Sequence, residues 1–68
     1  MKEVRLLSEK IKQMRISKNI TREKFAIETG IARSHIYRIE QAESSPSIKM
    51  LVRIAQTLGV SVKDLIEF

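Results

Sequence analysis

The chain has 68 residues, of which 43% are hydrophobic and 31% are charged, and a chain of this length holds one small core. We therefore predict a single domain over residues 1–68. The sequence contains no cysteine and one histidine, His35, which excludes disulfides, thiolate nucleophiles and cysteine-type zinc sites. We expect His35 to face solvent on a helix, and we expect no metal and no cofactor.

The net charge is +5, with a sequence pI near 10.0, and the positive charge lies in the first half of the chain. Up to Arg38 there are ten lysines and arginines against four glutamates, and from Ile39 onward three against four acids. A one-sided cationic surface is typical of a protein that binds a polyanion. The alternative is that solvated helix faces rich in lysine produce the same net positive charge. The apolar runs are too short to span a bilayer, so we predict a cytoplasmic protein that does not bind membranes.

The first predicted element is an amphipathic helix near the N-terminus. Apolar residues recur there at intervals of three and four, which places them on one helix face: Val4, Leu7, Ile11 and Met14. We expect this helix to close at Lys18, because the following Asn19 tolerates the left-handed backbone conformation that ends helices.

Two short helices follow, separated by a glycine. Thr21 is a suitable N-cap for a helix over residues 22–29, and Gly30 supplies the positive φ that the turn needs. A third helix is predicted from Ala32 or Arg33 to Gln41. Two helices of this length around a glycine turn are typical of a helix-turn-helix, and this spacing indicates a protein that binds double-stranded DNA.

Packing requirements agree with this interpretation. Steeply crossing helices need a small residue where they meet, and Ala26 occupies that place. Helical spacing directs Ile36 and Ile39 inward against Phe25 and Ala26.

The second half of the sequence predicts a loop and two more helices. Glu43 to Ser47, with Pro46, form a loop. The apolar face of a fourth helix, which Gly59 ends, consists of Ile48, Leu51, Ile54, Ala55 and Leu58. Ser61 and Asp64 resemble a capping box that opens a short last helix. No strand pattern occurs, so the predicted fold is all-α, a compact five-helix bundle.

These residues resemble the Cro and repressor type of helix-turn-helix, a large bacterial and phage family also named after the xenobiotic response element. The resemblance covers about residues 7–68. It rests on Ile20-Thr21, Phe25-Ala26, Gly30-Ile31, Arg38-Ile39-Glu40, Pro46-Ser47-Ile48 and Leu58-Gly59-Val60-Ser61. It implies the fold of the phage-repressor DNA-binding domain, a third helix that enters the major groove, and regulation of transcription at palindromic operators. Three residues depart from the family pattern: Arg22 replaces a glutamine, Thr29 an apolar residue and Ala42 a glycine.

The exposed face of the third helix is the predicted base-reading surface. Opposite Ile36 and Ile39 a helical wheel places four residues, which we call the recognition face: Arg33, Ser34, Tyr37 and Arg38. Arginine is suited to a guanine edge, where it donates two hydrogen bonds. Ser34 and Tyr37 have the alternative of simply facing solvent.

Further residues are predicted to contact phosphates. Helix N-termini present unpaired amides, which favours anions there. The candidates are Thr21 and Arg22 at the second helix, and Ser44, Ser45, Ser47 and Lys49 in the loop and at the fourth helix. For the serines and Lys49 the alternative is a plain turn role. The family resemblance also implies that Arg15 pairs with Glu40 and braces the third helix.

The last helix leaves more apolar surface than a small monomer needs, which predicts a homodimer interface through Leu65, Ile66 and Phe68. The alternative is that these residues complete the core. The residue inventory argues against an enzyme, because the chain has no cysteine, one histidine, no glycine-rich phosphate loop and no paired acids around a substrate cavity, and we expect no small-molecule ligand. The alternative function is a protein-protein interaction module of the same fold, for example one that is antitoxin-like.

Overall fold

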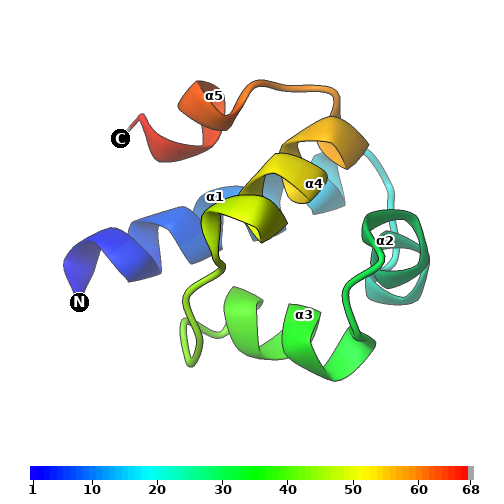
Figure 1. Cartoon of the computed structure of the whole chain (residues 1–68), viewed down its shortest axis with the longest axis horizontal. Coiled ribbons are helices and arrows are strands. Elements are labelled where there is room, and N and C mark those ends of the chain that lie inside the picture. Colours follow the sequence, from blue (N-terminus) through cyan, green and yellow to red (C-terminus); the bar gives the residue numbers. More distant parts are fainter. Residues whose placement is uncertain (68) are drawn as a thin grey trace.

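The computed structural model describes residues 1–67, which form five helices and no strand. The helices are α1 (Lys2–Ser17), α2 (Arg22–Thr29), α3 (Arg33–Glu40), α4 (Ile48–Leu58) and α5 (Val62–Ile66). In Figure 1, α1 and α4 lie in the middle of the molecule, with α3 on one side of them and α5 on the other. The predicted all-α class and the order of five helices are confirmed.

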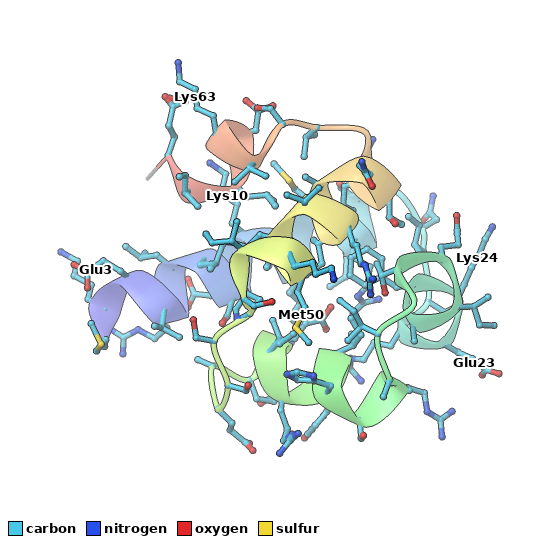
Figure 2. The ribbon with its side chains drawn as sticks, viewed as in Figure 1. Glu3, Lys10, Glu23, Lys24, Met50 and Lys63 are labelled. Carbon is cyan, nitrogen blue, oxygen red and sulfur yellow. The ribbon has the colours of Figure 1, made fainter. Side chains whose placement is uncertain are left out.

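One hydrophobic core joins all five helices. Its largest fully buried apolar side chains are Ile11 of α1, Phe25 of α2, Ile36 and Ile39 of α3, Ile54 and Leu58 of α4, and Leu65 of α5. Each such side chain stabilises the fold by about 1.5 to 3 kcal/mol relative to an exposed one. Met50 extends this packing between α4 and α3 (Figure 2). The helix-turn-helix pair is therefore held by the same core as the rest of the chain.

The burial of Leu65 corrects one prediction. This side chain is completely buried, because α5 turns it toward α1 and α4 rather than toward solvent. It completes the core and offers no surface to a second molecule.

The ends of α1 and α2 follow the sequence signals. Asn19 has φ +58 two residues after the end of α1, and Gly30 has φ +73 directly after α2. The Thr21 hydroxyl accepts the backbone N–H of Lys24 at 3.1 Å, as an N-cap does. The third helix begins at Arg33 and ends at Glu40, one residue before the predicted end.

The last two helices begin at capping serines. Ser47 accepts the backbone N–H of Met50 at 3.2 Å, and Ser61 forms the predicted capping box with Asp64. The backbone N–H of Ser61 donates to the Asp64 carboxylate, which holds the pKa of that carboxyl below its usual value. At the C-terminal end of α5, Lys10 of α1 donates to the backbone oxygen of Glu67 at 2.6 Å.

Two departures from the family pattern are accommodated locally. The buried Thr29 hydroxyl donates to the carbonyl of Phe25 at 2.8 Å and accepts the N–H of Ile31 at 3.3 Å, so it satisfies backbone groups at the turn. Ala42 adopts φ +59, the conformation that the usual glycine favours. For a residue with a β-carbon this conformation costs about 1 to 2 kcal/mol.

Candidate DNA-binding surface

The recognition face lies on the exposed side of α3. Arg33, Ser34, Tyr37 and Arg38 are all exposed, whereas Ile36 and Ile39 are buried, as the helical wheel predicts. The four residues line a shallow hollow of about 600 Å³ together with Arg22 and Glu23 of α2. The structure therefore brings the four candidates together and adds two residues from the preceding helix.

The hollow is mostly cationic. Three arginines line it against one acid, Glu23, whose carboxylate lies 3.8 Å from Nη1 of Arg33. Both side chains of this pair are largely exposed, so the interaction is weak and a stronger anion can displace it. Glu23 points away from α2 into solvent (Figure 2). A concave surface of this charge attracts phosphate and the electronegative edge of guanine.

Glu40, at the end of α3, is bound by an arginine of α1. Nε of Arg15 donates to one carboxylate oxygen of Glu40 at 2.6 Å, and Nη2 donates to the other at 3.1 Å. Arg15 Nη1 also donates to the carbonyl of Ile20 at 2.7 Å. Both side chains are buried, so this is a desolvated two-pronged ion pair that fixes α3 against α1.

Arg22 joins the same carboxylate. Its Nε donates to Glu40 Oε1 at 3.0 Å, and its Cζ lies 5.3 Å from the centroid of the Tyr37 ring. We call Arg15, Arg22 and Glu40 the Glu40 cluster. The sequence predicted Arg22 only as a phosphate contact and missed this link. The arginine in place of the family's usual glutamine is the sequence feature that could have indicated this link.

Four of the predicted phosphate contacts are exposed: Thr21, Ser45, Ser47 and Lys49. Among them, the hydroxyls of Thr21 and Ser47 accept backbone N–H groups of their own helices. The Ser44 hydroxyl shares a 3.3 Å hydrogen bond with Nε2 of His35. His35 is therefore half-buried against the loop, which corrects the expectation that it faces solvent.

The C-terminal helix retains one exposed residue of the predicted dimer interface. Ile66 is 49% exposed, whereas Phe68 lies outside the described residues. Two apolar side chains that sequence reasoning assigned to no interface, Ile48 and Val52, are also exposed one turn apart on α4. Within residues 1–67 no helix is long and apolar enough to cross a membrane.

A short helix, a left-handed glycine turn and a second helix with an exposed arginine-rich face define a helix-turn-helix protein. The model of the helix-turn-helix family matches residues 11–65 of the chain. The chain belongs to this family, the DNA-binding regulators of the Cro and repressor type.

Two relatives illustrate the family. The chain is 39% identical over 64 residues to the control protein C.BamHI of Bacillus amyloliquefaciens, a match that covers 93% of this chain and 79% of that protein. It is 32% identical over 63 residues to the transcriptional regulator SinR of Bacillus subtilis, covering 91% of this chain and 57% of that protein.

Solved structures have the same fold. The restriction-modification controller protein C.AhdI of Aeromonas hydrophila superposes with a TM-score of 0.92 at 18% identity, covering 96% of this chain and 98% of that one. At this identity the likeness concerns the fold alone. SinR, in a crystal structure with DNA, superposes with a TM-score of 0.85 at 32% identity, covering 90% of this chain and 98% of that one.

Proposed function

We propose that this protein is a sequence-specific transcriptional regulator, a repressor or controller that binds a palindromic operator in double-stranded DNA as a homodimer. The observation that carries the proposal is the recognition face. Arg33 and Arg38 stand exposed on α3 and line a cationic hollow, and among the described residues that line it Tyr37 contributes the one apolar group, its ring.

In this proposal α3 lies in the major groove and its residues have separate roles. Arg33 and Arg38 donate paired hydrogen bonds to guanine, and Ser34 and Tyr37 contact neighbouring bases. Phosphates on either side are bound by Thr21, Arg22, Ser44, Ser45, Ser47 and Lys49. These phosphate contacts fix the position of α3 on the duplex without reading its sequence.

The relatives support the class of ligand and of activity. SinR has been crystallised with DNA, and C.BamHI is a control protein. The basic first half of this chain suits the same polyanion, because neutralising phosphates releases counterions from the duplex.

The proposed function is tested by selecting duplexes from a random library and measuring their affinity at several salt concentrations. We expect a selected duplex to bind far more tightly than random DNA. The logarithm of affinity should fall with the logarithm of salt by about 0.9 per phosphate neutralised. A selected duplex that binds no better than random DNA at moderate salt would contradict sequence-specific binding.

The dimer is tested with Ile66→Lys. A charge on this half-exposed side chain should reduce binding to a full operator much more than binding to a single half-site, because only the full operator holds two molecules in contact. Half-sites read by two helices around a two-fold axis should lie about 34 Å apart, one turn of DNA.

Ile16→Lys is the matched control, since Ile16 on α1 is 48% exposed and Ile66 is 49% exposed. It should change the affinity for both duplexes by the same factor. Equal losses on both duplexes in Ile66→Lys would rule out an interface on α5. A selective loss in Ile48→Lys alone would move the interface to α4.

A further inference from the structure

The contacts of Arg22 tie the start of α2 to the recognition face. Its Nε binds a carboxylate that is completely buried, so one edge of the guanidinium is fixed in the protein interior. The same guanidinium lies 5.3 Å from the centroid of the Tyr37 ring, within the range of a cation–π contact. Arg22 is thus the connection between Glu40, at the end of α3, and the ring that projects from the middle of α3.

The Tyr37 ring needs a support of this kind, because its own place on α3 does little to fix its rotamer. It is 46% exposed on a solvent-facing side of α3, where a side chain normally exchanges between rotamers rapidly. The Arg22 side chain is 39% exposed but is anchored below the surface. A planar guanidinium fixed at one edge provides a flat, rigid surface against which an aromatic ring stacks.

We propose that Arg22 is a positioning residue that fixes the Tyr37 ring as a reader of a thymine methyl group at one operator position. An aromatic ring provides the apolar contact by which the 5-methyl of thymine is distinguished in the major groove. Arg22 and Tyr37 line the same hollow as Arg33, Ser34 and Arg38, which places the ring among the other recognition residues. This inference rests on the proposed function, since it assigns a base to that recognition face.

Substitutions of Arg22 can separate the charge of this side chain from its shape. Arg22→Lys keeps the positive charge that a phosphate attracts, but an ammonium lacks both the planar surface and the Nε–H that binds Glu40. Arg22→Gln is a second variant, which removes the charge and the cation–π contact while keeping a polar side chain. Arg53→Lys on α4 is the matched control, because it makes the same chemical change at an exposed arginine outside the recognition face.

The first measurement needs no DNA. Tyr37 is the only tyrosine and the chain has no tryptophan, so tyrosine fluorescence reports on this ring alone. In Arg22→Lys and Arg22→Gln we expect faster decay of fluorescence anisotropy and stronger quenching by acrylamide than in the wild type, and no change in Arg53→Lys. A Tyr37 ring that is equally immobile in both Arg22 variants would overturn the positioning role.

The second measurement repeats the duplex selection with the variants. Arg22→Lys should lose about 10-fold of discrimination at one operator position, the position also lost in Tyr37→Ala, while its salt dependence stays that of the wild type. The variant that carries both Arg22→Lys and Tyr37→Ala should lose no more discrimination at this position than Tyr37→Ala alone. Replacing thymine by deoxyuridine at that position should weaken the wild type and leave Tyr37→Ala unchanged.

The two failures are distinguishable. If the wild type discriminates between duplexes but Arg22→Lys retains every preference, the inference is wrong and the proposed function stands. If the wild type binds all duplexes alike, the proposed function is wrong, and so is the assignment of Tyr37 to a thymine. In that case the fluorescence result still decides whether Arg22 holds the ring.

Discussion

Glu40→Ala is expected to destabilise the protein by about 3 to 5 kcal/mol, because it leaves the buried guanidinium of Arg15 without its counter-charge. Both carboxylate oxygens of Glu40 are bonded to Arg15, at 2.6 and 3.1 Å, and the Glu40 side chain is completely inaccessible to solvent. In a domain of this size each kcal/mol shifts the melting temperature by about 4 to 8 °C. Thermal unfolding followed by circular dichroism should therefore show a fall of more than about 10 °C.

The pairing itself is tested by a double-mutant cycle. Arg15→Ala should also be strongly destabilising, and the variant that lacks both side chains should lose less than the sum of the single losses. Glu23→Ala is the control, since its ion pair with Arg33 is largely exposed and should contribute no more than about 1 kcal/mol. Strictly additive losses would show that Arg15 and Glu40 contribute independently.

The stability of this ion pair bears on function through its position. Glu40 is the last residue of α3, and the Glu40 cluster connects it to α1 through Arg15 and to α2 through Arg22. A recognition helix of eight residues has little stability of its own, because isolated helices shorter than about 12 residues are marginal in water. The cluster therefore holds the recognition face at a fixed angle to the rest of the fold.

Local signals made much of this fold predictable. A cap or a turn depends on residues within one turn of helix, which is why Thr21, Gly30 and the Ser61 capping box lie where the sequence places them. The recognition face was predictable for the same reason. Once Ile36 and Ile39 are assigned to the core, the period of the helix leaves its other side to solvent.

Features that depend on two distant elements were not predictable in the same way. The link from Arg22 to Glu40 joins side chains 18 residues apart in sequence, and no spacing rule places them together. His35 bonds to Ser44 only because the loop after α3 folds back over the helix. The five residues of α5 are too few for a helical period to separate its buried side from its exposed side, so the sequence pattern does not show that Leu65 is buried.

Arg33→Ala and Arg38→Ala are each expected to remove about 1 to 3 kcal/mol of discrimination at one operator position, the value of a paired hydrogen bond to guanine. Both side chains are exposed in the free protein, so little has to be broken before they bind. Within the described residues Arg33 forms one ion pair, with Glu23, in which Nη1 lies 3.8 Å from the carboxylate and both side chains are largely exposed. Both variants should keep the wild-type melting temperature.

The measurement is a selection of duplexes with each variant, followed by titration of single-position operator variants. Each arginine variant should become indifferent at one position and remain selective at the others. Lys49→Ala is the control: as a predicted phosphate contact, it should weaken every duplex alike and lower the salt slope by about one. If Arg33→Ala and Arg38→Ala instead weaken all duplexes uniformly, these arginines bind phosphate, and sequence is read by other residues of the recognition face.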